Sequence, residues 1–194
     1  MPSPKEWAEK GKVRRITRWS EPVMHQKTRP VEKFDDELHT LVADMFATML
    51  AADGVGLAGP QVDVDLAIFT YYCPDGDDVM QSGVVCNPVI ILPEGKDRQL
   101  NTVEEGCLSW PGAYQSLART DMAVCEGVDE NGQPVRIEAT GLLARCVQHE
   151  TDHLNGTVFG DRLSTRARRE LDKKQAAANH LYPDDWPLSP KTLV

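Results

Sequence analysis

The chain has no run of apolar residues long enough to cross a membrane, and its 194 residues contain no internal repeat. Its first twelve residues, MPSPKEWAEKGK, lack the apolar centre of a secretory signal, so we expect a cytoplasmic protein. The five cysteines are an odd number, which favours free thiols over a disulfide framework. Basic residues are also scarce: 21 Lys and Arg against 30 Asp and Glu give a net charge of −9, which argues against general nucleic-acid binding.

Apolar residues are plentiful enough to build a core. They make up 41% of the chain, which suffices for one domain of ordinary size. We therefore expect a single domain over residues 1–194, with 1–12 and 182–194 as extended tails. Three prolines in the second tail exclude a continuing helix there.

Periodic patterns predict the main elements. Apolar stripes and capping residues predict helices from Asp35 or Asp36 to just before Gly54, over 141–156, and from Ser164 or Thr165 to Leu181. Apolar runs predict strands over 66–72, 84–92 and 97–103, and Pro88 favours a sheet edge for the second of these. Asn131-Gly132, between alternating runs over 122–128 and 134–139, predicts a β-hairpin.

The segment QHETDHLNG, residues 148–156, contains the motif H-E-x-x-H. Two histidines four residues apart leave a helix on the same face, so both imidazoles can bind one metal ion. Glu150 lies between them and is suited to move protons on a metal-bound water. Leu142 and Cys146 continue the histidine stripe, which turns this face toward the interior. The simpler interpretation is two ordinary histidines on an amphipathic helix.

A catalytic metal site needs a third protein ligand. One class of metalloproteases places a His six residues after the second histidine, but Phe159 occupies that position here. A second class uses a downstream Glu, and Glu170 is the only glutamate after the motif. A third class uses a Cys from upstream.

Two upstream segments carry weaker signals. GVGLAGPQ, residues 54–61, does not have the spacing of a dinucleotide-binding loop. Its glycines predict a tight loop whose backbone comes close to another group of the protein or to a ligand. EEGCLSWPG, residues 104–112, predicts a thiol on a loop or strand end at Cys107. The ordinary interpretation of a lone cysteine is a small buried apolar residue.

Taken together, GVGLAGPQ, EGCLS and QHETDHLNG resemble, in this order, the three motifs of the peptide deformylase family. The second and third motifs match completely, while Gly59 replaces the usual second Ala of the first. Arg145 stands at a position that is often apolar in the family. The resemblance covers about residues 13–181 and leaves out both tails.

The resemblance implies a role for each matching residue. It implies that the metal ligands are Cys107, His149 and His153. Glu150 is then the general acid/base, and Gln61 and the backbone N–H of Leu108 donate hydrogen bonds to the oxyanion. The residues that surround the methionine side chain and the backbone of the substrate are then Val55, Gly56, Val103, Gly106, Leu142 and Cys146. The family's metal is usually Fe²⁺, with Zn²⁺, Ni²⁺ or Co²⁺ as substitutes.

We therefore expect an α+β fold, with antiparallel sheets around the H-E-x-x-H helix and one helix before and one after it. The expected function is metal-dependent hydrolysis of the N-formyl group from N-formylmethionyl nascent polypeptides, with release of formate. One alternative is an endopeptidase that uses Glu170 as third ligand, and another is a module with a structural metal. We expect a monomer and hypothesise a weak ribosome contact through the basic stretch 166–174.

Overall fold

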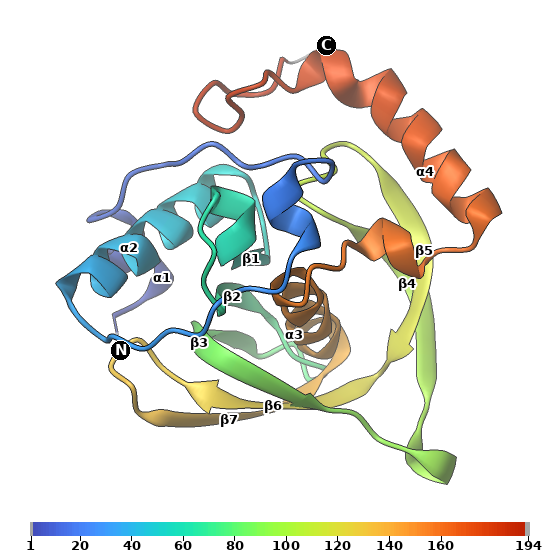
Figure 1. Cartoon of the computed structure of the whole chain (residues 1–194). Coiled ribbons are helices and arrows are strands. Elements are labelled where there is room, and N and C mark those ends of the chain that lie inside the picture. The colour runs from blue at the N-terminus through green and yellow to red at the C-terminus, as the bar shows by residue number, and fades with distance from the viewer. Residues whose placement is uncertain (1, 193–194) are drawn as a thin grey trace.

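The structure is a computed structural model that describes residues 2–192 (Figure 1). The α-helices in this range are α1 (Pro4–Ala8), α2 (Asp36–Ala51), α3 (Gly141–Leu154) and α4 (Thr165–Ala178). The strands are β1 (Gly56–Ala58), β2 (Ile68–Pro74), β3 (Met80–Ile91), β4 (Leu100–Gly106), β5 (Tyr114–Thr120), β6 (Met122–Val128) and β7 (Pro134–Thr140). All strand pairs are antiparallel, which confirms the predicted α+β class.

Helix α3 lies between two sheets (Figure 1). The larger sheet has the strand order β1-β2-β3-β6-β7, and the smaller one is the two-stranded ribbon β4-β5. Leu143, Ala144 and Val147 of α3 pack in one apolar cluster with Phe69 of β2 and Cys125 of β6. The helix is therefore fixed by apolar burial on the sheet side, and its opposite side is available for the motif residues.

Helix α2 forms the centre of a second apolar cluster. Asp35 caps its N-terminus by accepting a hydrogen bond from the Leu38 backbone N–H at 3.2 Å. The predicted stripe is buried as far as Met49, including Met45 and Phe46, and its last residue, Leu50, is partly exposed. This helix and its cap are as the sequence predicts.

The position of Pro88 differs from the prediction. Strand β3 is the central strand of its sheet, not an edge strand. The register between β3 and β6 shifts between Cys86 and Val89, so the proline lies at a bulge, where its missing N–H removes no ladder hydrogen bond. The sequence also gave no signal for β1 or β5.

The N-terminal segment is not an extended tail. Ser3 and Glu6 form a capping box that starts helix α1. Trp7 is buried and its ring stacks on Phe46 of α2, with ring centroids 6.5 Å apart. The prediction for residues 1–12 was therefore wrong, because a single large apolar side chain suffices to hold a short capped helix against α2. Residue 1 lies outside the described part of the chain.

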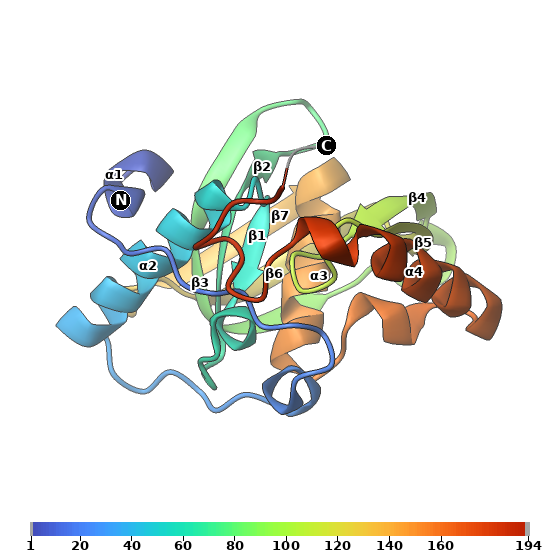
Figure 2. The same ribbon diagram turned by 90° about the horizontal axis from the view of Figure 1, so that it is seen from above.

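The C-terminal segment also differs from an extended tail. Helix α4 ends at Ala178, and a 3₁₀ turn continues to Leu181, the predicted end of the helix. Residues 182–192 then fold back in turns toward α2 (Figures 1 and 2). The buried Trp186 joins the apolar cluster around α2, which holds the segment in place. Residues 193–194 lie outside the described range. No helix among residues 2–192 has the length and apolar character that crossing a membrane requires.

The packing of α1 predicts a measurable stability effect. Trp7→Ala should lower the free energy of unfolding by about 3 kcal/mol, because it leaves a cavity beside Phe46. Urea unfolding monitored by circular dichroism measures this change. Lys5→Ala, an exposed position on the same helix, is the control and should stay within about 0.5 kcal/mol. Equal unfolding midpoints for Trp7→Ala and the unchanged chain would mean that α1 contributes nothing.

Candidate active site

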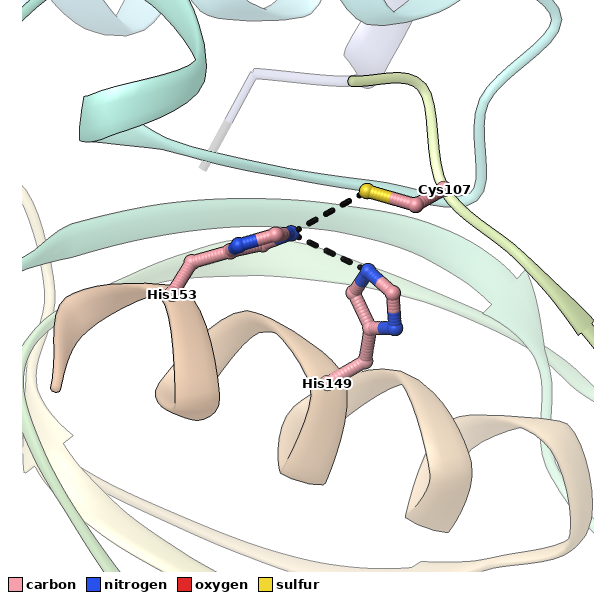
Figure 3. Close-up of side chains that lie close together, drawn as sticks. All are labelled: Cys107, His149 and His153. Carbon is pink, nitrogen blue, oxygen red and sulfur yellow. Dashed lines mark hydrogen bonds between the residues drawn. The ribbon is translucent and has the colours of Figure 1, made fainter. Parts of the chain in front are cut away.

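Helix α3 presents His149 and His153 from successive turns of one face (Figure 3). Their Nε2 atoms lie 3.1 Å apart, and the rings meet edge to face with centroids 4.7 Å apart. Both side chains are buried. The chain turns away soon after this pair, because Gly156 adopts a φ of 73°, the left-handed conformation that ends many helices.

Cys107 directly follows strand β4 and brings its thiol to the two imidazoles (Figure 3). Its Sγ lies 3.4 Å from Nε2 of His153. One ligand atom from each of the three residues lies within 4.8 Å of the other two. A tetrahedral ion with ordinary metal–nitrogen and metal–sulfur bonds separates its ligands by roughly 3.3 Å for N–N and 3.6 Å for N–S. The observed separations are close to these values, so the three side chains could hold one divalent metal ion.

Glu105 fixes the orientation of the His149 ring. Its Oε1 accepts a hydrogen bond from His149 Nδ1 at 2.7 Å, and Arg119 donates to both carboxylate oxygens at 2.7 Å. Burial raises the pKa of Glu105, but the hydrogen bonds from Arg119 and His149 outweigh burial and hold this pKa well below its ordinary value. The ionised carboxylate keeps the imidazole proton on Nδ1, which leaves Nε2 of His149 free to bind a metal.

Arg145 and Asp152 extend this buried network. Arg145 donates to Glu105 at 2.7 Å and to two backbone oxygens, one on β4 and one on β5, at 2.8 and 3.0 Å. Asp152 accepts from Arg119 at 2.9 Å and from Arg162 at 2.6 Å. Each buried charge therefore has an opposite charge in direct contact, as burial in a low-dielectric interior requires.

The histidine pair favours a positive charge between its nitrogens. Burial is the main cause that lowers the pKa of His153 well below its ordinary value, and the charge of the nearby His149 lowers it further. The His153 ring is therefore neutral. Burial opposes protonation of His149, but Cys107 and Glu105 together raise its pKa well above the ordinary value. The two Nε2 atoms lie 3.1 Å apart, so a proton or another cation between them is favoured over two facing lone pairs. A divalent metal supplies that cation, so these donors fit the group that the motif predicts.

Glu150 lies beside the histidines with one oxygen unoccupied. The residue is buried, and its Oε2 has no hydrogen-bond partner among residues 2–192. Burial raises the pKa of Glu150 to about 7. Gly56 allows this approach, because a Cβ at that position would lie 2.4 Å from Glu150 Oε1 and 2.7 Å from Cys146 Sγ. The carboxyl group is thus held close to the candidate metal site with an oxygen available.

Gln61 and Leu108 flank Cys107. The Gln61 side chain is buried and oriented by its Oε1, which accepts from the Ala58 backbone N–H at 2.9 Å. Its Nε2 donates to Ser109 Oγ at 3.2 Å and lies 3.7 Å from Cys107 Sγ. The backbone N–H of Leu108 donates no hydrogen bond within residues 2–192. Two N–H donors therefore lie next to the candidate metal ligand.

A cavity of about 600 Å³ opens onto this site, and Cys107, His149 and Glu150 are among the residues that line it. Of the six residues predicted to surround the substrate, five line the cavity: Val55, Gly56, Gly106, Leu142 and Cys146. The sixth, Val103, is 43% exposed on β4 and is not among the lining residues. The cavity also contains residues that the sequence did not indicate, from the C-terminal segment and the loop after Cys107.

Glu170, the alternative third ligand, lies elsewhere. It is exposed on α4, where Arg166 and Gln115 donate to its carboxylate at 3.2 and 3.3 Å. The grouped ligand atoms are those of Cys107, His149 and His153. The geometry therefore brings the upstream cysteine to the histidines and leaves Glu170 apart from them.

The sequence did not predict the residues behind the ligands. Glu105 was visible as the first letter of E-G-C-L-S but had no assigned partner, and Asp152 was visible inside the histidine motif. Arg119 lies on β5, a strand without a sequence signal. The charge of Arg145 was out of place on an apolar stripe, which is the one local sign that a buried counter-charge would be needed.

A buried Cys-His-His cluster beside a helical glutamate, open to a cavity, is typical of the class of metal-dependent hydrolases. Comparison with known proteins identifies the family within this class. Residues 13–169 match the family model described as polypeptide deformylase. The chain belongs to this family, whose members are hydrolases that remove the N-formyl group from nascent peptides.

Individual relatives agree with this assignment. A peptide deformylase 1 of Streptomyces avermitilis is 46% identical over 177 residues, which cover 91% of this chain and 82% of that protein. The crystal structure of a peptide deformylase from Legionella pneumophila is similar with a TM-score of 0.77 and 38% identity, over 87% of this chain and 96% of that one. A peptide deformylase from Synechococcus elongatus in complex with actinonin is similar with a TM-score of 0.74 and 37% identity, over 86% and 92% of the two chains.

The Glu105 network predicts an effect on metal affinity. Glu105→Gln keeps the shape of the side chain but removes the charge that orients His149, so metal affinity should fall by about 10- to 100-fold. Competition with a chromophoric chelator for Zn²⁺ measures the affinity. Glu104→Gln, the exposed neighbour on β4, is the matched control. Equal affinities for Glu105→Gln and the unchanged chain would show that Glu105 does not support the ligand set.

Proposed function

We propose that this chain removes the formyl group from N-formylmethionyl peptides at the site formed by Cys107, His149, His153 and Glu150. The observation that carries the proposal is the cluster of three ligand atoms within 4.8 Å, next to a buried glutamate and open to a cavity. A structural metal would be closed by four protein ligands, whereas this ligand set faces the cavity. This openness favours the catalytic alternative over a structural module.

The chemistry divides between the metal and Glu150. A divalent ion held by Cys107, His149 and His153 would supply Lewis acidity, which would activate the attacking water and polarise the formyl carbonyl. Glu150 accepts the proton of the attacking water at its free Oε2 and delivers it to the nitrogen of the leaving amine. Burial keeps this carboxyl group away from competing bulk water. The products are formate and a peptide with a free N-terminus.

The oxyanion is stabilised by the two donors that flank Cys107. We propose that Gln61 Nε2 and the Leu108 N–H donate hydrogen bonds to the carbonyl oxygen as negative charge develops on it. The hydrogen bond from Ala58 to Gln61 Oε1 supports this role, because it turns the NH₂ group of the amide toward Cys107. Each donor of this type contributes roughly 3 kcal/mol to transition-state stabilisation.

We assign the methionine side chain and the substrate backbone to the part of the cavity lined by Val55, Gly56, Gly106, Leu142 and Cys146. This lining is mostly apolar and lies beside the metal ligands. Val103 belongs to the exposed outer part of β4 in this assignment. Actinonin, which is present in the Synechococcus elongatus complex, should occupy the same cavity in this chain.

We propose Fe²⁺ as the working metal, with Zn²⁺, Ni²⁺ or Co²⁺ as possible substitutes. The support is the ligand set, since a thiolate donates more charge to the ion than a third imidazole does and makes it a weaker Lewis acid. A redox-active ion in this setting is exposed to oxidation together with Cys107.

The proposed function predicts three outcomes when two quantities are measured for each variant: the bound metal, and formate release from formyl-Met-Ala-Ser under anaerobic conditions with Fe²⁺. Glu150→Gln should keep its metal but lose about 100- to 10,000-fold in kcat, because the general acid/base is gone. Cys107→Ala should lose tight metal binding. Glu170→Ala should match the unchanged chain in metal content and rate.

Loss of metal in Glu170→Ala, with Cys107→Ala still loaded, would support the endopeptidase alternative. Full activity of Glu150→Gln would remove the proposed acid/base. An enzyme that is equally active with Zn²⁺ and Fe²⁺, and indifferent to air, would show that iron is not required.

We further propose that residues 1–194 act as one monomeric catalytic domain in the cytoplasm, where nascent chains emerge. A weak ribosome contact through residues 166–174 is part of this proposal. Arg169 and Lys173 are exposed on α4 and suited to contact RNA phosphate. Arg168 is less available, because its guanidinium stacks on Trp19 and Trp110 at 4.6 and 4.4 Å from the ring centroids.

The ribosome contact predicts a salt-sensitive association. Arg169→Glu with Lys173→Glu should reduce co-sedimentation with ribosomes at low salt, because the charge that faces RNA is reversed. Turnover of formyl-Met-Ala-Ser should not change, since both residues are remote from the metal ligands. Lys10→Glu with Lys12→Glu is the charge-matched control. Absence of ribosome association for the unchanged chain at low salt would refute the contact.

A further inference from the structure

The C-terminal segment, residues 182–192, lies outside the region that matches the family model. Figures 1 and 2 show it turning back from the end of α4 toward α2. Five of its residues line the same cavity as Cys107 and Glu150, namely Tyr182, Trp186, Pro187, Pro190 and Lys191. The segment is therefore part of the wall of the cavity that contains the candidate metal site.

This wall is anchored at several points. The Trp186 backbone carbonyl accepts a hydrogen bond from the Ile16 N–H at 2.9 Å, and its ring is buried against the α2 cluster. Arg18 donates to the Pro183 carbonyl at 2.9 Å. The Thr192 N–H donates to the Leu181 carbonyl at 2.9 Å, which closes the segment into a loop. A substrate would thus meet a surface that is already formed.

The segment also contacts the loop that follows Cys107. Gly112 adopts a φ of 75°, and a Cβ at this position would lie 2.8 Å from the Tyr182 ring. The glycine therefore permits close packing between this loop and the C-terminal segment. Pro111, Gly112 and Ala113 line the cavity together with Tyr182. The two segments form one continuous surface that begins at Pro111, four residues after the candidate metal ligand Cys107.

The size and lining of the cavity indicate what meets this surface. A volume of about 600 Å³ exceeds the space that a single formylmethionyl residue fills. The substrate is the start of a longer chain, so the next residues must leave through the same cavity. Within residues 2–192, the Lys and Arg residues that line it are Arg145 and Lys191, and the Arg145 guanidinium is already bound to Glu105. The exposed Lys191 is therefore the cation available to a substrate.

We propose that the C-terminal segment binds the residues that follow formylmethionine in the substrate, and that Lys191 favours an acidic side chain among them. The proposal rests on the deformylase function proposed above. The rings of Tyr182 and Pro190 provide apolar surface for the peptide, while Lys191 discriminates by charge. Asp53 and Glu104 place negative charge elsewhere on the lining, so the preference for acidic residues depends on the segment.

The test compares two tetrapeptide substrates, formyl-Met-Ala-Asp-Ala-amide and formyl-Met-Ala-Lys-Ala-amide, and a second pair with Asp or Lys one residue later. The measurement is the ratio of kcat/KM for the Asp peptide to that for the Lys peptide. Lys191→Glu should lower this ratio by about fivefold in at least one pair, because an attraction becomes a repulsion. Lys10→Glu is the charge-matched control and should leave the ratio unchanged.

A second variant tests the apolar and the charged part of the wall together without truncating the chain, since removal of Trp186 would disturb the core. Pro190→Ala with Lys191→Ala should reduce, by about threefold, the gain in kcat/KM on lengthening formyl-Met-amide to a tetrapeptide. Leu188→Ala is the matched control, because Leu188 is 55% exposed in the same segment and does not line the cavity. Unchanged ratios in both variants would overturn the role of the segment and leave the deformylase function standing. Absence of formate release from every peptide with the unchanged chain would overturn both.

Discussion

The site depends on the contact between one buried carboxylate, Glu105, and three cationic or hydrogen-bonding partners. Cys107 directly follows strand β4 of the β4-β5 ribbon, whereas both histidines belong to α3, so the candidate metal ligands meet only if the ribbon and the helix are held in place relative to each other. Glu105 on β4 binds Arg119 on β5 and both Arg145 and His149 on α3. Removing one member of such a buried set leaves an unpaired charge, which costs about 3–5 kcal/mol. The same contacts that hold the ribbon to the helix therefore also orient His149.

The charge balance around Glu105 has a consequence for the metal. The charge of Asp152 on α3 is neutralised by Arg119 and by the half-exposed Arg162. Glu105 is neutralised by Arg119 and Arg145. Because arginines compensate both carboxylates, a divalent ion at the site would be balanced mainly by the Cys107 thiolate and by Glu150. Glu150 forms no ion pair with an arginine within residues 2–192, and burial raises its pKa to about 7, which suits a group that accepts and returns a proton near neutral pH.

The sequence predicted those parts of the fold whose signals are local. Asp35 caps α2, Asn131-Gly132 joins β6 to β7, and the histidine spacing requires α3 to be a helix. Strand β1 was missed because three residues that begin with glycine carry no strand pattern. Strand β5 was missed because its sequence has no regular alternation of apolar and polar residues. Its buried Arg119 is explained by Glu105, which lies on the same side of the ribbon, and this placement follows from the pairing register of β4 with β5. Only the family resemblance predicted that Cys107 lies close to His149 and His153, which come roughly forty residues later in the chain.

Composition alone predicted extended tails at both chain ends, and the packing of residues 2–12 and 182–192 explains why this prediction was wrong. The first twelve residues and the last thirteen are rich in charge and proline, which is typical of segments without a core of their own. Each nevertheless contains a tryptophan, Trp7 or Trp186, that packs into the cluster around α2. A large aromatic ring buries enough surface to hold a short segment when an apolar site is available on the folded body. For Trp186 that site is next to the cavity of the candidate active site, so the attachment that stabilises the C-terminal segment also places its neighbours on the cavity wall.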